Sequence, residues 1–99
     1  MQQVVTKFGG TSVSSLQTWE NIAAITKQHI ANGVQPVIVC SALTQISNKL
    51  EQAINAALLN QHQTIEAEIR HGHMELAQAL QVSPELITTE LEQLHQWLT

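Results

Sequence analysis

The chain has 99 residues, a formal net charge of −4 and 43% hydrophobic residues. This length makes one small domain at most, and the four cations are too scattered for the basic surface that nucleic acids or anionic membranes require. A single cysteine excludes a disulfide within the chain. No apolar run approaches the ~20 residues of a membrane span, and the N-terminus has no signal-peptide pattern. We therefore expect a cytoplasmic protein that binds neither membranes nor nucleic acid.

The first half of the chain is predicted to form a strand–helix–strand unit. Residues 3–8 are β-branched and mostly apolar, which is typical of a buried strand that ends at residues 9–10. Thr11 or Ser12 can cap the helix that follows. Residues 36–40 are apolar without polar alternation, as expected for a second, parallel strand that is covered on both faces.

The second half is predicted to form three helices in succession. Apolar residues recur at helical spacing over residues 46–58, 65–80 and 87–98. Ser83-Pro84-Glu85 predicts the start of the last helix, with the serine as N-cap and the proline at the first helical position. Two strands make an incomplete sheet, and the last helix reaches the final residue without a C-cap. We therefore expect the fold to continue beyond this chain.

The segment Lys7–Val13, with the sequence Lys-Phe-Gly-Gly-Thr-Ser-Val, concentrates groups that bind phosphate. Lys7 supplies a full charge at the end of a strand, and Gly9 and Gly10 let backbone N–H groups approach anionic oxygens closely. Hydroxyls such as that of Ser12 add donors near a helix N-terminus, which favours anions. The lysine precedes the glycines, whereas it follows them in the common P-loop. A plain tight turn with a surface lysine is therefore the open alternative.

A second polar loop, residues 41–48, follows the second strand. In open α/β sheets, ligands bind beyond the carboxyl ends of the strands. Because parallel strands place these ends at one edge, we expect Ser41 to face the same crevice as Lys7. The alternative for Ser41 and Ser47 is capping of the next helix, and one residue can do both.

The Lys-Phe-Gly-Gly-Thr-Ser-Val segment resembles the opening signature of aspartokinases, within the amino-acid-kinase superfamily. Residues 41–48 are similar to that family's second loop, whereas the second half of the chain resembles the family only in type. The resemblance implies an α/β fold, a three-layer α/β/α sandwich of which residues 1–99 are the incomplete N-terminal part of a catalytic domain. It implies transfer of the γ-phosphoryl group of ATP, bound with Mg²⁺, to the β-carboxylate of L-aspartate. That reaction is the first step of lysine, threonine and methionine biosynthesis.

The same resemblance implies a role for five residues at the phosphate end of the site. Lys7 is the expected catalytic residue, which neutralises the ATP phosphates and the transferring group. Gly9 and Gly10 would offer backbone N–H groups to phosphate oxygens, with Ser12 nearby. Ser41 would contact the transferring phosphate. Such roles suit phosphoryl transfer, in which catalysis is mostly positioning and charge stabilisation.

The aspartate end of the implied site departs from the family pattern. Ser47 stands where the family often has a threonine that holds aspartate, and Gln45 stands where it usually has glycine or another small residue. The family's acidic and arginine aspartate ligands and its adenine pocket have no counterpart in these 99 residues. We therefore expect the isolated chain to be inactive.

The remaining histidine, cysteine and tryptophan residues suggest no further chemistry. We expect no metal site, because His71 and His73 point to different sides of a helix and lack a third ligand. Buried, packing roles are expected for four residues: Cys40, Gly72, Trp19 and Trp97. Surface positions are expected for three histidines: His29, His62 and His95.

Two other functions are compatible with the sequence. One is a different amino-acid-kinase relative, acting on glutamate, carbamate or a nucleotide. The other is a non-catalytic module that self-associates through its helices. An incomplete sheet with three amphipathic helices leaves apolar surface without cover. We therefore predict a homo-oligomer, formed through residues 46–98 or through the strand edges.

Overall fold

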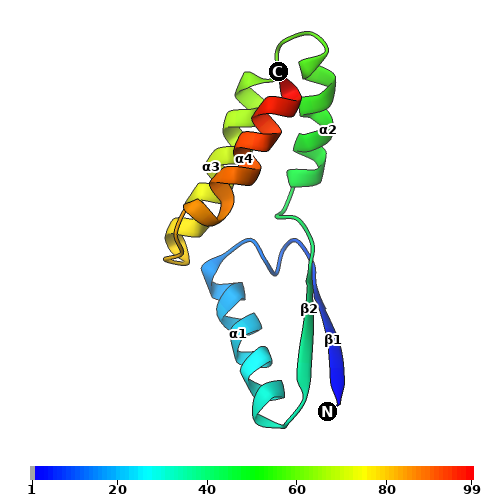
Figure 1. The fold of residues 1–99 in the computed structure, drawn as a ribbon, viewed down its shortest axis with the longest axis vertical. Helices are drawn as coiled ribbons and strands as arrows, with labels where there is room; N and C mark the ends of the chain where they lie inside the picture. Colours follow the sequence, from blue (N-terminus) through cyan, green and yellow to red (C-terminus); the bar gives the residue numbers. More distant parts are fainter. Residues whose placement is uncertain (1) are drawn as a thin grey trace. The chain divides into compact units, whose positions relative to one another are not determined.

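The computed structural model describes residues 2–99, which divide into two compact units, the first ending at Thr44 and the second beginning at Gln45 (Figure 1). The length alone predicts one small domain, so the division is a feature that only the structure reveals. The element order is β1 (Gln3–Phe8), α1 (Leu16–Ala31), β2 (Gln35–Cys40), α2 (Ile46–Ala57), α3 (Gln63–Ala79) and α4 (Glu85–Leu98). The predicted α/β class, a strand–helix–strand unit followed by three helices, is confirmed.

The first unit is a two-stranded parallel sheet with α1 beside it (Figure 1). The register runs from Gln3 opposite Gln35 to Phe8 opposite Cys40. α1 contacts β2, and every second residue of β1 is half-buried. Val5 and Val39 are nevertheless 68% and 44% exposed, and Cys40 is exposed too. The predictions of strands covered on both faces and of a buried Cys40 are wrong for the described residues, because this unit supplies one helix to its sheet.

The helix α1 begins later than the sequence predicts. Its N-cap is Ser15, whose hydroxyl accepts a hydrogen bond from the Thr18 N–H at 3.3 Å. The expectation that Thr11 or Ser12 caps this helix is therefore wrong. The N–H of Ser12 instead donates to the carbonyl of Gly9 at 3.0 Å. This bond forms a turn that delays the helix by a few residues.

Four described residues near helix ends have a left-handed backbone: Gly33, Gln45, Asn60 and Gln81. Gly33 follows the C-cap of α1 at φ 74°, the conformation in which glycine commonly ends a helix. Gln45 is the N-cap of α2 at φ 69° and forms no side-chain cap bond. The capping alternative for Ser41 and Ser47 is therefore wrong. The left-handed backbone makes glycine the residue that suits position 45 best, because glycine has no Cβ.

The second unit is a bundle of α2, α3 and α4, which run side by side (Figure 1). Its buried core consists of six residues: Ile46, Ala53, Ile69, Ala77, Leu91 and Leu98. Four of them belong to the predicted apolar stripes and the two alanines do not, whereas the predicted stripe members Ile54 and Leu58 are exposed. The N-cap of α4 is Pro84, one residue later than the predicted Ser83. The Ser83 hydroxyl accepts from the Glu85 N–H at 3.3 Å. The prediction of a surface position for His62 is wrong. This residue is 1% exposed just before α3, and neither ring nitrogen has a hydrogen-bond partner in residues 2–99.

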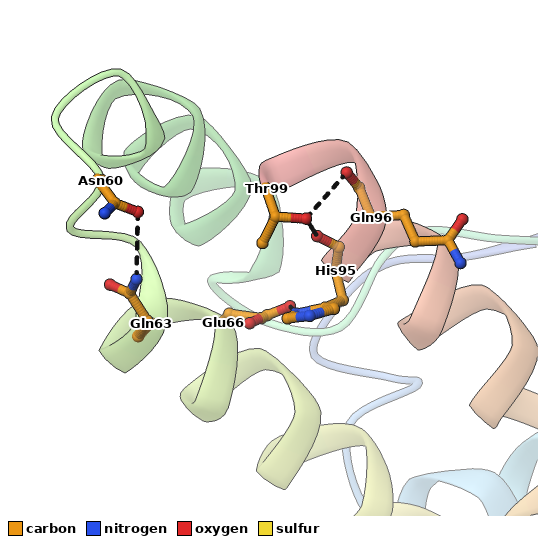
Figure 2. Close-up of polar contacts among 6 residues, drawn as sticks. All are labelled: Asn60, Gln63, Glu66, His95, Gln96 and Thr99. Atoms are coloured by element: carbon orange, nitrogen blue, oxygen red, sulfur yellow. Dashed lines mark hydrogen bonds and ion pairs between the residues drawn. The ribbon is translucent and has the colours of Figure 1, made fainter.

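Polar contacts tie the ends of α3 and α4 together, as Figure 2 shows. His95 Nδ1 lies 2.7 Å from Glu66 Oε1, which links the two helices. The Thr99 hydroxyl donates to the carbonyls of His95 and Gln96 at 3.1 and 3.3 Å. The His95 carbonyl also accepts from the Thr99 N–H at 3.1 Å, so the hydroxyl supplies the partner of the Gln96 carbonyl, and the helix has a cap that its sequence does not predict.

Several packing predictions fail where no neighbour covers the residue. Trp97 is 77% exposed, and a Cβ at Gly72 would meet no atom within 4 Å in the described chain. Trp19 does pack, because its half-buried indole N–H donates to the Val13 carbonyl at 2.7 Å. His73 lies by the carbonyl of Ile69. Across residues 2–99 no helix has both the length and the apolar content to span a bilayer.

Candidate phosphate-binding site

The candidate site lies at the carboxyl ends of β1 and β2, within the first unit. Phe8 and Cys40 are the last paired residues of the two strands. The N–H of Ser41 then donates to the Phe8 carbonyl at 3.0 Å. Ser41 is thus held beside the start of the glycine turn, as the parallel pairing predicts.

Three consecutive backbone donors are free in the glycine turn. Within residues 2–99, the N–H groups of Gly9, Gly10 and Thr11 have no backbone or side-chain acceptor. The next two N–H groups, of Ser12 and Val13, are occupied, since both donate to the Gly9 carbonyl at 3.0 and 3.2 Å. Successive free N–H groups in a turn form a concave surface that binds anions. Among the described residues, the N–H groups of Gly9, Gly10 and Thr11 are therefore available to an anionic ligand.

Lys7 supplies the positive charge next to these donors. It is the second-last residue of β1, it is exposed, and its register partner is Val39. No carboxylate among residues 2–99 forms an ion pair with it, although such pairs occur elsewhere in the chain. A cation without a protein counter-charge is available to an anionic ligand.

The predicted site residues fall into two groups. Five of them are at one end of the sheet: Lys7, Gly9, Gly10, Ser12 and Ser41. Ser41 is exposed and Ser12 is half-buried. Ser47 belongs to the second unit, where it is exposed in the first turn of α2.

Two residues that the sequence does not single out connect the loops of the site. Ser14 lies in the turn after β1, and Thr44 closes the loop after β2. The Thr44 N–H donates to Ser14 Oγ at 2.9 Å, and the two hydroxyls lie 3.0 Å apart. Ser14 Oγ also donates to the Gly10 carbonyl. Both loops are rich in hydroxyl residues, but 30 positions separate the two partners, so the sequence does not reveal their pairing.

Comparison with known proteins places these features in a family. The model of the amino acid kinase family matches residues 2–95. Aspartokinase 1, chloroplastic, of Arabidopsis thaliana is 32% identical over 95% of this chain, and an aspartokinase of Rickettsia felis is 38% identical over 56% of it. The aspartate kinase of Pseudomonas putida is 42% identical over 50%. The chain covers only 17%, 14% and 12% of these three relatives, respectively.

Proposed function

Because the chain belongs to the amino acid kinase family, we propose that the turn after β1 binds the phosphates of ATP in an aspartate kinase. The observation that supports this most strongly is the run of three free N–H donors at Gly9, Gly10 and Thr11, beside Lys7 without an ion pair. The names of the relatives supply the acceptor, aspartate. In the alternative, a plain turn with a surface lysine, these N–H groups would donate to water instead of to a phosphate.

The proposed reaction moves the γ-phosphoryl group of ATP to the β-carboxylate of L-aspartate. In this proposal Mg²⁺ arrives on the phosphates of ATP. Lys7 and the free N–H groups stabilise negative charge on the phosphates as the group transfers. Ser12 and Ser41 donate hydroxyl hydrogen bonds to phosphate oxygens, and Ser47 holds the aspartate.

We further propose that residues 1–99 are the N-terminal part of an aspartokinase catalytic domain. The relatives are several times longer than this chain, which leaves room in them for aspartate and adenine contacts. We expect the 99-residue chain to bind phosphate groups without forming aspartyl phosphate. Its proposed compartment is the cytoplasm, and its proposed role is the first step of lysine, threonine and methionine synthesis.

The test measures, by isothermal titration calorimetry, the affinity of the purified chain for MgATP and for pyrophosphate. Lys7→Ala should weaken both by about 10-fold or more, because a hydrogen bond to a charged group contributes roughly 1.5–3 kcal/mol. Lys27→Ala is the matched control, since Lys27 is an exposed lysine on α1 in the same unit. Equal affinities for the two variants, or no binding by the unmodified chain, would contradict the proposal. In a full-length parent, Lys7→Ala should lower kcat by ~100-fold.

Self-association is a second proposed property, and a separate observation favours it. Large apolar side chains of the second unit are strongly exposed: Ile54 at 61%, Leu58 at 82%, Leu59 at 69%, Leu86 at 69% and Trp97 at 77%. Exposed apolar groups of this kind often mark interfaces. We propose that a second copy of the chain covers some of them, with residues 46–98 as the contact surface.

A further inference from the structure

The hydroxyl of Ser14 has its full hydrogen-bonding capacity in use. A serine hydroxyl offers one donor and two acceptor positions. Ser14 Oγ donates to the Gly10 carbonyl and accepts from the Thr44 N–H at 2.9 Å. The Thr44 hydroxyl, 3.0 Å away, fills the second acceptor position. Such complete use of a half-buried hydroxyl indicates a specific structural link.

This link joins the two loops of the candidate site. Within residues 2–99, the hydrogen bonds between residues 9–15 and 42–44 all use Ser14. The loops also touch directly, because a Cβ at Gly10 would lie 3.0 Å from the Ala42 carbonyl oxygen. Beyond the strand pairing and the Ser41–Phe8 bond, one hydroxyl and one glycine therefore connect residues 9–15 to residues 42–44.

The bond from Ser14 to Gly10 also orients a donor of the site. The Gly10 carbonyl and the Thr11 N–H belong to one planar peptide group and point in opposite directions. A hydroxyl that holds the carbonyl therefore sets the direction of the Thr11 N–H. That N–H is one of the three free donors of the turn.

We infer that Ser14 is a positioning residue of the phosphate site, an inference that rests on the proposed function. Its bond to the Gly10 carbonyl orders the Thr11 N–H. Its bonds to Thr44 hold the loop that also carries Ser41. Ser14 does not need to touch the ligand for this. Donors that are ordered before the ligand arrives bind more tightly, because less freedom is lost on binding.

The experiment compares MgATP affinity and amide hydrogen exchange among four variants of the chain. Ser14→Ala should weaken MgATP binding about 5- to 10-fold, as loss of one ordering hydrogen bond does. It should also speed exchange of the Thr44 amide by about 10-fold. Ser14→Thr keeps the hydroxyl and should bind within about 3-fold of the unmodified chain. Lys7→Ala reports separately on the proposed function.

Ser15→Ala is the control for a general loss of stability. Ser15 is the neighbouring serine and caps α1 through Thr18, so its loss should cost stability typical of an N-cap. Because it makes no bond to the loop after β2, its MgATP affinity and its Thr44 exchange should change by less than about 2-fold.

Each outcome separates the inference from the proposed function. If Ser14→Ala binds MgATP normally while Lys7→Ala is weakened, the positioning role is refuted and the phosphate site stands. If the unmodified chain binds no MgATP, both fail. If Ser14→Ala does not fold, Thr44→Val replaces it, because it removes one of the three contacts. Weaker binding by Thr44→Val then supports the inference, and unchanged binding overturns it.

Discussion

Replacing Gly10 with alanine would place a methyl group against the loop that follows β2. The added Cβ would lie 3.0 Å from the Ala42 carbonyl oxygen and 3.5 Å from the Thr44 nitrogen. Both neighbours are backbone atoms, so the loop itself must move by a few tenths of an ångström. Gly9→Ala is the matched control, because a Cβ there would meet no atom within 4 Å in the described chain.

The expected cost can be worked from this geometry. Forcing an extra methyl group into a packed contact costs about 1–3 kcal/mol. Against this, alanine restricts the unfolded chain, which offsets about 0.4–1 kcal/mol. We expect Gly10→Ala to lower the free energy of unfolding of the first unit by about 1–2 kcal/mol. Gly9→Ala should change it by less than about 0.5 kcal/mol or raise it slightly.

The two tryptophans allow the first unit to be observed alone. Trp19 lies in α1, with its indole N–H bonded to Val13, whereas Trp97 is 77% exposed in the second unit. In a Trp97→Phe background, Trp19 fluorescence during urea unfolding reports on the first unit. Equal stability of Gly10→Ala and Gly9→Ala would refute the close approach of the two loops on which the argument depends.

Two further predictions concern the second unit. Gln45→Gly should raise the free energy of unfolding by about 0.5–1 kcal/mol, because glycine relieves the left-handed backbone at φ 69°. Gln52→Gly, the same change inside α2, should lower the free energy of unfolding by about 1 kcal/mol. Urea unfolding, monitored by circular dichroism, measures both variants. If both substitutions lower the free energy of unfolding, the left-handed backbone at residue 45 is contradicted. The proposed self-association predicts a dimer or larger species in sedimentation equilibrium at micromolar concentration, which Leu58→Glu should weaken, since Leu58 is 82% exposed. A monomer that unfolds cooperatively would show that no second copy covers these residues.

The sequence by itself determined the order and type of the elements. Residues 3–8 form the first strand as predicted, and Gly33 ends α1 in the left-handed conformation. The spacing of apolar residues located the three later helices. These features depend on neighbours a few positions away, and local backbone preferences are strong enough to reveal them. The Lys7–Val13 segment also indicated the candidate site, because its glycines and lysine are close together in the sequence.

Only the tertiary structure decided which groups are buried and which hydroxyls meet. Several hydroxyl residues in the turn after β1 were able to cap α1. Because the N–H groups of Ser12 and Val13 donate to the Gly9 carbonyl, the helix begins later and Ser15 is its N-cap. Ser14 and Thr44 meet across 30 positions because the parallel pairing of β1 with β2 brings their loops together. His62 is buried although its surrounding sequence is polar. Burial and long-range hydrogen bonds depend on how whole elements pack, and the pattern along one segment does not contain that information.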